Sequence, residues 1–200
     1  MILKVVQNGY ENYIDVDSWV DYYIIQEFIA NNDMCSRSTY FYKDKGGKIK
    51  MGPVWDFNNI CDNYIGAEFN TQGFHFADNK IWYTMLLKDE KFVNKVQERY
   101  KELRKTYLSE EYLMNYIDES IEYLGDAINR NFDVWGYTFE RENQNSKIEY
   151  LFPIERNPQN YDEAIEQYKT FLIERGRWLD ENIDSLEQYS HYSKNKLYVE

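Results

Sequence analysis

Apolar side chains recur at the spacing of an α-helix between Asp15 and about Ala30. Asp15 or Asp17 can cap the start of this helix, because a carboxylate at the N-cap accepts a hydrogen bond from the backbone of the first turn. The run Asn31-Asn32-Asp33 ends the helix. The expected inward face consists of Trp19, Val20, Tyr23, Ile24, Glu27 and Phe28.

The same helical spacing returns after Lys80 and predicts four further segments. The first is short, the second follows a cap at Asp89, and the third opens at Ser109. The last runs from Asp162 to about Leu186. Their expected inward residues are Ile81, Trp82, Met85 and Leu86; Phe92, Val96, Tyr100 and Leu103; Leu113, Tyr116, Ile117, Ile121 and Leu124; and Ile165, Tyr168, Leu172, Ile173 and Leu179.

Two stretches lack any clear period and are predicted to be loops. One covers residues 59–79 and contains Gly66 and Gly73, and the other covers residues 131–160 and holds two of the three prolines. A loop of about twenty residues inside a compact domain is usually functional or mobile. We therefore look for function near the first of these loops.

A β-hairpin is predicted between the first helix and the first loop. Ser38–Lys43 is rich in Thr, Tyr and Phe, Asp44-Lys45-Gly46-Gly47 is suited to a turn, and Lys48–Trp55 runs back. With the turn centred near Lys45 and Gly46, residues directly opposite each other share a face of the hairpin. This register places Tyr40 and Tyr42 on one face with Ile49 and Met51.

Two carboxylates flank the open end of this hairpin. The same register puts Asp56 opposite Cys35, about two residues from Asp33. Such a pair can flank a glycosidic bond, bind a divalent cation, or divide the work of phosphoryl transfer between substrate and Mg²⁺. The plainer interpretation is that Asp33 ends a helix and Asp56 caps a turn. The spacing alone leaves these four readings open.

Composition narrows the class of protein. A chain of 200 residues that is 43% hydrophobic and 18% aromatic has enough apolar material for a folded core. Its net charge of −12 argues against nucleic acid, which requires a basic surface, and against an anionic membrane. Cys35 and Cys61 are too few for a disulfide framework. Both lie near the hairpin mouth, which leaves a single disulfide as one alternative, and two unpaired thiols are expected over it. No apolar run is long enough to span a membrane, and residues 1–7 lack the pattern of a signal peptide.

Several motifs resemble the spore-coat protein H (CotH) kinase family, and the resemblance covers nearly the whole chain. The most specific match is the run from Gly52-Pro53-Val54-Trp55 to Asp56-Phe57-Asn58. The other matching stretches are residues 13–19, Asn32-Asp33, residues 38–44, residues 47–51, Trp82-Tyr83, Leu86-Leu87, Leu108-Ser109-Glu110, and Arg175-Gly176-Arg177-Trp178-Leu179-Asp180.

The resemblance implies an atypical protein-kinase-like fold and transfer of the ATP γ-phosphate to Ser of a secreted or spore-coat protein, with Mg²⁺ or Mn²⁺. By this likeness, Asp33 stands where the catalytic-loop aspartate orients the substrate hydroxyl. Asp56 stands where the metal-binding aspartate holds Mg²⁺. Expected supporting residues for metal or nucleotide are Asn32, Ser38, Asn58 and Asn63.

The chain departs from the family pattern at two positions. A kinase catalytic loop usually offers an Asn about five residues after its Asp, and here Ser38 occupies that place. The family also tends to have Gly before the residue matched to Asn63, and this chain has Asp62. The added carboxylate is expected either to serve as a further ligand or to stiffen the loop.

The expected organisation is a mostly helical α+β domain over residues 1–200, equivalent to a kinase C-terminal lobe. Within it, 1–14 leads in, 15–58 forms the helix and catalytic hairpin, 80–188 is helical and 189–200 is a tail. The 30 or so residues before Asp33 cannot form the nucleotide-covering lobe, so activity is expected only when an upstream lobe is present. The expected partner is a coat or surface protein substrate, with a location in the spore coat, at the cell surface or outside the cell. The alternatives are a non-catalytic coat-assembly or surface-binding protein and, more remotely, a glycosidase.

Overall fold

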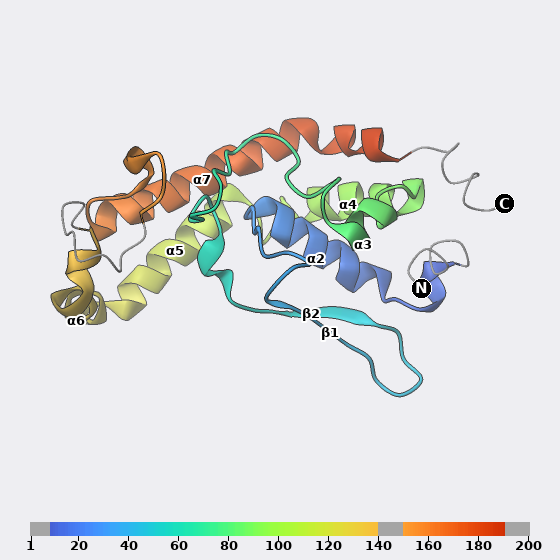
Figure 1. The fold of residues 1–200 in the computed structure, drawn as a ribbon, viewed down its shortest axis with the longest axis horizontal. Coiled ribbons are helices and arrows are strands. Elements are labelled where there is room, and N and C mark those ends of the chain that lie inside the picture. Colours follow the sequence, from blue (N-terminus) through green and yellow to red (C-terminus); the bar gives the residue numbers. More distant parts are fainter. Residues whose placement is uncertain (1–8, 140–149, 191–200) are drawn as a thin grey trace.

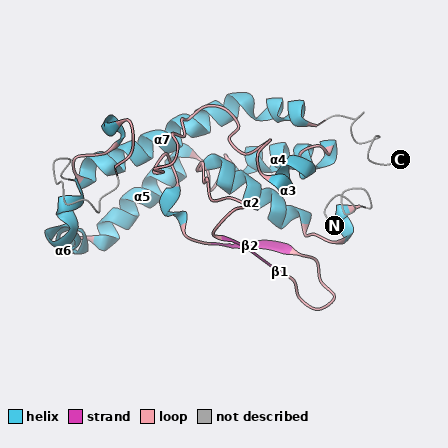
Figure 2. Ribbon diagram, viewed as in Figure 1, coloured by secondary structure: helices cyan, strands magenta, loops and turns pink. Residues whose placement is uncertain are grey.

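The computed structural model describes residues 9–139 and 150–190 (Figure 1). Helices predominate over a small two-stranded sheet in this part of the chain (Figure 2), which confirms the expected mostly helical α+β class. Residues 1–8 of the expected 1–14 lead-in and residues 191–200 of the expected 189–200 tail lie outside the described residues. The elements are η1 (Tyr10–Asn12), α2 (Val16–Phe28), β1 (Thr39–Tyr42), β2 (Lys50–Val54), η2 (Phe57–Asn59), α3 (Ile81–Leu86), α4 (Glu90–Leu103), α5 (Glu110–Leu124), α6 (Asp126–Trp135), η3 (Gly136–Phe139), η4 (Ile154–Arg156), α7 (Tyr161–Asn182) and η5 (Ile183–Tyr189).

Helix α2 occupies the centre of the molecule and contacts α4, α7 and β2. Asp15 is its N-cap, and its carboxylate accepts a 3.0 Å hydrogen bond from the Ser18 amide, as the sequence predicted. All six residues expected on its inward face are buried. Tyr83 of α3 is fully buried against this helix, and its hydroxyl donates to the Trp19 carbonyl at 3.0 Å. The core is therefore assembled around α2.

The hairpin forms where it was predicted, but its register was predicted wrongly. The turn is correct, because the Gly47 amide donates to the Asp44 carbonyl at 3.0 Å. The observed pairs, however, are Phe41 with Met51, Tyr42 with Lys50 and Thr39 with Val54, with an irregularity between Thr39 and Phe41. Met51 therefore shares its face with Phe41 instead of Tyr40, and Asp56 is not opposite Cys35.

The physical reason for the shifted register lies on the other side of the returning strand. Ile49 pairs with the chain before α2: its amide donates to the Tyr13 carbonyl at 2.8 Å and its carbonyl accepts from the Asp15 amide at 2.9 Å. Ile49 therefore pairs with Ile14 and not with a residue of β1. Tyr42 pairs instead with Lys50, one residue later than predicted. The pairing of Ile49 with Ile14 is not visible in the local sequence of the hairpin.

Helices α5 and α6 correct two further predictions. Residues 131–160 were predicted to be a loop, but α6 continues to Trp135 and is followed by η3. Phe132 supports this region, because its ring lies 5.2 Å from that of Phe139 and 5.3 Å from that of Tyr161. The inward face expected for α5 is also only partly correct: Leu113 and Ile117 pack on the core, whereas Tyr116 is 61% exposed and Leu124 49%. Figure 1 shows why, since α5 and α6 extend away from α2.

The run from Arg175 to Asp180 fastens α7 to α4. Gly176 lets the two helices approach closely here, because a Cβ at this position would lie 2.9 Å from the guanidinium of Arg104 and that side chain would have to shift. Arg104 pairs with Asp180 at 2.6 Å, and the Tyr100 hydroxyl donates to the Gly176 carbonyl at 3.1 Å. This closing motif therefore has a packing role on one side of α7.

On the other side of α7, Arg175 forms a buried ion pair with Glu27 of α2. The distance between Arg175 Nη2 and Glu27 Oε1 is 2.7 Å, and the side chains are 0% and 3% exposed. Glu27 also accepts hydrogen bonds from the amides of His75 and Phe76, at 2.6 and 3.0 Å. Arg175 donates in addition to the carbonyls of Thr71, Gly73 and Glu27.

This pair therefore joins three segments that are far apart in the sequence: α2, the loop at residues 71–76, and α7. Burial raises the pKa of Glu27, while Arg175 and the two amides oppose that rise. The pKa of Arg175 is lowered by burial. Burial of two charges is costly, and it is tolerated only when the remaining donors and acceptors are satisfied, as they are here.

Replacement of Arg175 by Met should lower the free energy of unfolding by about 3–5 kcal/mol, because the Glu27 carboxylate is left buried without its counter-charge. Urea denaturation followed by circular dichroism measures this loss. The matched control is Arg177→Met, two residues along the same helix, where the side chain is 65% exposed and pairs with Glu110 at 3.2 Å. The control should lose less than about 1 kcal/mol. Equal losses in the two variants would contradict the central role of the pair.

His75 gives the fold a predictable response to acid. Burial, and then the nearby charge of Arg175, lower its pKa from 6.5 to about 4, and Nε2 lies 2.9 Å from the Asn70 carbonyl. The unfolded chain therefore takes up a proton below pH 6.5 that the folded chain takes up only near pH 4. Stability from this group is complete above pH 6.5 and falls as the pH drops through that window, by up to about 3 kcal/mol.

His75→Gln keeps an amide that can donate to the Asn70 carbonyl but removes the titration. Between pH 7 and pH 4, the free energy of unfolding should fall less steeply in this variant than in the wild type. Urea denaturation at pH 7, 6, 5 and 4 measures both slopes. Parallel slopes would show that His75 does not contribute.

Candidate functional site

Asp33 lies in the turn that connects α2 to the hairpin, and it is 7% exposed. Its backbone is held on both sides: its amide donates to Asn31 Oδ1 at 3.1 Å, and its carbonyl accepts from the amides of Ser36 and Arg37 at 3.0 and 2.9 Å. Its carboxylate accepts a 3.3 Å hydrogen bond from the Asn59 side chain through Oδ2. Asp33 is therefore a buried carboxylate fixed by a tight local turn.

Asp56 lies just beyond the end of β2 and is exposed. Its φ of 60° places it in the left-handed region, which few residues other than Gly, Asn and Asp adopt. Its Oδ2 accepts a hydrogen bond from the Ser38 hydroxyl at 3.3 Å. The backbone thus turns sharply at this carboxylate before η2 begins.

Two hydrogen bonds cross between the Asp33 turn and the segment that begins at Asp56. Asn59 reaches back to Asp33, and Ser38 reaches forward to Asp56. The two segments therefore form one hydrogen-bonded unit at the open end of the hairpin, and each of them carries one of the carboxylates. The Asn59 and Ser38 side chains connect the segments, whereas the sequence suggested that direct strand register would bring the carboxylates together.

The other predicted site residues surround this unit in different ways. The Asn63 side chain donates to the Asn58 carbonyl at 2.8 Å, and the Asn58 side chain donates to Asn59 Oδ1 at 3.4 Å. Both amides are exposed. Asn32 takes part through its main-chain carbonyl, which accepts a 2.7 Å hydrogen bond from Lys80 Nζ.

Lys80 was missed by the sequence analysis. It is half-buried at the start of α3, with Nζ 5.1 Å from the centroid of the Phe76 ring and in electrostatic contact with Asp33. Burial lowers its pKa, and electrostatic interaction with Cys35 and Asp33 opposes that shift. No motif marks a single lysine 47 residues after Asp33 as part of the site, so only the fold could reveal it.

Backbone strain is concentrated around the same unit. In the described residues, every non-glycine residue with positive φ lies between positions 30 and 62: Ala30, Cys35, Ser38, Asp56, Cys61 and Asp62. Such conformations cost about 1–3 kcal/mol each and persist where surrounding contacts enforce them, commonly at functional sites. This clustering supports a functional role for the segment.

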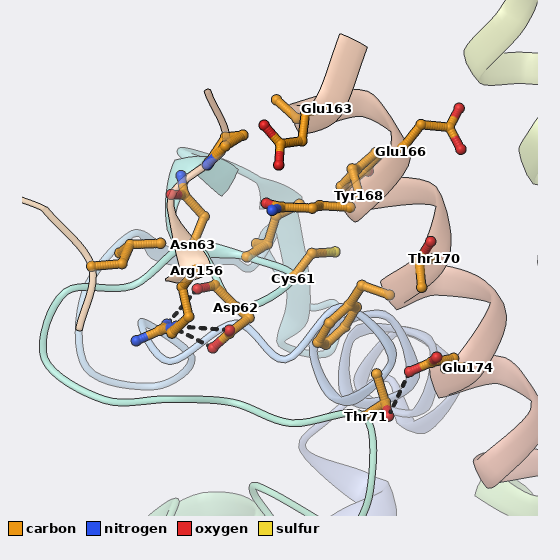
Figure 3. Close-up of a pocket in the computed structure, with 16 residues that line it drawn as sticks. Cys61, Asp62, Asn63, Thr71, Arg156, Glu163, Glu166, Tyr168, Thr170 and Glu174 are labelled. Carbon is orange, nitrogen blue, oxygen red and sulfur yellow. Dashed lines mark hydrogen bonds and ion pairs between the residues drawn. The ribbon is translucent and has the colours of Figure 1, made fainter. Parts of the chain in front are cut away.

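A cavity of about 620 Å³ adjoins the far end of this segment (Figure 3). Asn63, Arg156 and the carboxylates of Glu163, Glu166 and Glu174 line it, together with residues of α7. Neither Asp33 nor Asp56 is among its lining residues. The cavity therefore adjoins the candidate site and shares Asn63 with it, but neither carboxylate lines it.

Asp62, the departure from the family pattern, forms an ion pair at this cavity. Arg156 holds both of its carboxylate oxygens, at 2.7 and 2.9 Å, and donates to the carbonyls of Tyr64 and Phe152 as well. Asp62 also accepts from the Phe69 amide at 2.6 Å. Of the two roles expected for this residue, its contacts favour stiffening of the loop.

The oxygen donors at the hairpin mouth suit a hard cation. Across residues 9–139 and 150–190, no three His, Cys, Asp or Glu side chains gather into a metal site. Mg²⁺ in phosphoryl-transfer enzymes usually binds one or two carboxylates together with water and the substrate phosphates. Asp56, with the exposed amides of Asn58 and Asn63, fits such a partly open site.

The two cysteines do not offer nucleophiles. Both are unpaired, as expected. Burial raises the pKa of the Cys35 thiol to about 12, and burial also raises the pKa of Cys61. Since a thiolate is the reactive form, neither residue is suited to covalent catalysis.

None of the described helices is long and apolar enough to cross a membrane.

Comparison with known proteins agrees with the motifs. No curated protein matches the chain. The model of the CotH kinase protein family matches residues 4–179, which is most of the chain and includes the whole hairpin and both carboxylates. The chain therefore belongs to the CotH kinase family.

Proposed function

We propose that this chain is the helical lobe of a protein kinase that transfers the γ-phosphate of ATP to a Ser hydroxyl of a protein. Membership of the CotH kinase family supports kinase-like function with ATP as co-substrate. The observation that carries the residue assignment is the pair of hydrogen bonds, Asn59 to Asp33 and Ser38 to Asp56, that joins the two carboxylate-bearing segments in one unit.

Asp33 is proposed to orient the substrate hydroxyl and to accept its proton as the oxygen attacks phosphorus. The buried turn fixes the backbone of Asp33, and the hydrogen bond from Asn59 orients its carboxylate, which is what a positioned base requires. Asn59 occupies only one of the two carboxylate oxygens with a hydrogen bond, at Oδ2. Oδ1 is the atom we assign to the hydroxyl.

Asp56 is proposed as the metal ligand, with Asn58 and Asn63 as neighbouring oxygen donors and Ser38 as the residue that orients Asp56. A bound Mg²⁺ or Mn²⁺ would neutralise charge on the phosphates. The left-handed backbone at Asp56 turns the chain out of β2, so the carboxylate remains exposed while Phe57 packs against the core. These residues therefore bind the metal and orient its ligand, and Asp33 accepts the proton of the substrate hydroxyl.

Lys80 is proposed to place positive charge beside Asp33. Its ammonium group fixes the Asn32 carbonyl, next to the proposed base, and it lies in partly buried surroundings where a charge acts more strongly than in water. Charge that develops on transferring phosphate is commonly stabilised by such a group.

The nucleotide-covering lobe is proposed to come from outside residues 1–200. Three aromatic or aliphatic side chains near the hairpin, none of them on β1, are at least half exposed: Tyr13, Val54 and Trp55. An exposed apolar surface of this kind is suited to contact with another domain. The substrate is proposed to be a coat or surface protein, in keeping with the spore-coat association of the family.

The alternative proposal is a non-catalytic protein that uses the kinase-like shell to assemble coat or surface partners. Ser38 in place of the expected Asn favours it, because one metal ligand of an ordinary kinase is then absent. The two proposals differ in one measurable property, the transfer of phosphate.

Asp33→Asn and Asp56→Asn should each reduce transfer at least about 100-fold. Asn tolerates the left-handed backbone, so Asp56→Asn removes charge without disturbing the fold. The assay follows labelled γ-phosphate from ATP with Mg²⁺ or Mn²⁺ to a Ser-rich acceptor, with the 200-residue chain and with any sequence that flanks it naturally. Asp44→Asn, in the exposed turn of the same hairpin, is the control and should retain full activity. Transfer that survives Asp56→Asn would contradict the assignment, and a folded wild type inactive in every form would favour the alternative.

Lys80→Met should lower kcat at least about tenfold while the KM for ATP changes little, because the charge acts on the transferring phosphate beside Asp33. Met retains most of the aliphatic side chain and removes the ammonium group, together with its contact over the Phe76 ring. Lys80→Arg restores the charge and should recover part of the rate. A rise in KM with kcat unchanged would assign Lys80 to nucleotide binding instead.

A further inference from the structure

The hairpin carries an unpaired backbone edge on one side only. On the outer side of β2, the amides of Ile49 and Met51 donate to Tyr13 O and Ser18 Oγ, at 2.8 and 3.2 Å. The outer side of β1 has no such neighbour: within the described ranges, β2 is the only strand with which Thr39–Tyr42 forms backbone pairs. Strand β1 therefore offers free N–H and C=O groups to an added strand.

The same hairpin is basic, although the chain as a whole carries a net charge of −12. Between Thr39 and Val54 there are four lysines and one aspartate. Lys50 pairs with Asp15 at 3.5 Å, whereas Lys43, Lys45 and Lys48 are exposed and form no ion pair with any described residue. Figure 1 shows the turn that carries these lysines projecting away from the helices.

Strand β1 connects this basic turn with the candidate site. Its first residue follows Ser38, which donates to Asp56, and Thr39 Oγ1 lies 3.5 Å from the Asp33 carbonyl. Lys43 directly follows the strand and is five residues after Ser38, so at about 3.3 Å per residue it lies roughly 16 Å from the site. Lys45 lies beyond it, in the turn closed by Asp44 and Gly47.

We propose that β1 is the docking edge for an extended acidic segment of the protein substrate, which pairs with the strand and places its carboxylates at Lys43, Lys45 and Lys48. This inference rests on the proposed function for the identity of the partner. Antiparallel pairing, the commoner and more stable arrangement, directs such a segment from the basic turn toward Asp33. The acidic residues then precede the acceptor Ser by about five to seven positions.

Side chains of the segment would lie beside Tyr40 and Tyr42, which are each 51% exposed and alternate with Phe41 along the strand. Phe41 packs edge-on against Trp82 of α3, at 5.9 Å between ring centroids, so the opposite face of the strand is supported by the helices. Backbone pairing supplies affinity in this mode, and the lysines select an acidic sequence.

The test measures fluorescence anisotropy of a labelled peptide that has three Asp or Glu residues five to seven positions before a Ser. The full chain should bind it, and Lys43→Glu/Lys45→Glu/Lys48→Glu should weaken binding at least about tenfold. The control, Lys91→Glu/Lys101→Glu/Lys105→Glu, makes the same charge change at exposed positions on and after α4 and should weaken it less than about twofold. Equal losses in the two variants would overturn the proposal.

A second arm uses the wild-type protein alone, so it does not depend on the folding of a variant. N-methylation of alternate peptide amides should weaken binding at least about tenfold, because it removes backbone donors, and replacement of the acidic residues by Gln or Asn should do the same. Undiminished binding of the methylated peptide would overturn strand addition. Equally tight binding of single-stranded DNA or anionic lipid vesicles would assign the lysines to a general polyanion surface and would also overturn it.

Failure of this proposal can be separated from failure of the proposed function. Asp56→Asn should bind the peptide as the wild type does, because the docking edge does not include the metal ligand. Binding without phosphate transfer to any acceptor would contradict the kinase and leave the docking edge intact. Transfer to a generic Ser-rich acceptor, with no preference for the acidic peptide, would contradict the docking edge alone.

Discussion

The buried ion pair between Glu27 and Arg175 is the constraint on which the rest of this structure depends. It fixes the last turn of α2 against α7 and holds the loop at residues 71–76 through four backbone groups. Asp33 lies six residues after Glu27, and Lys80 lies four residues after Phe76, the last residue of the loop. The two segments that supply these residues therefore leave from one fixed point, which determines where the proposed base and its neighbouring charge can lie.

The candidate site has two parts: the fold holds the Asp33 part rigidly, and the Asp56 part is exposed to solvent. Asp33 is buried in a turn with both backbone groups bonded, whereas Asp56, Asn58 and Asn63 are exposed. The non-glycine residues with positive φ lie around both parts, at positions 30–38 and 56–62, and the Asp62–Arg156 pair holds the end of the second stretch. This division suits phosphoryl transfer, in which positioning contributes most and the phosphates arrive with their metal from solvent.

The sequence correctly predicted those features of the fold that depend on interactions between residues close together in the chain. The Asp15 cap, the inward face of α2, the hairpin turn and the candidate carboxylates all follow from short-range patterns, and the CotH motifs named the family before any coordinates. The hairpin register was predicted wrongly because Ile49 pairs with Tyr13 and Asp15, a contact made by residues more than thirty positions away. Lys80 and Arg156 could not have been found, since isolated basic residues in loops have no distinguishing pattern. Glu27 did give a signal: a carboxylate on an apolar helix face requires a buried partner, although nothing identified Arg175 as that partner. The roles of Asp33 and Asp56 stay predictions.

The central claim is that Asp33 and Asp56 serve one phosphoryl-transfer site, and paramagnetic NMR with Mn²⁺ and a non-hydrolysable ATP analogue tests it most directly. Mn²⁺ broadens the resonances of nearby nuclei, so it reports where the metal binds even in a protein without measurable activity. The account predicts broadening of amides in residues 32–38 and 56–63 together, and its loss in Asp56→Asn. Broadening centred instead on Glu163, Glu166 and Glu174 at the neighbouring cavity, unchanged in Asp56→Asn, would contradict it.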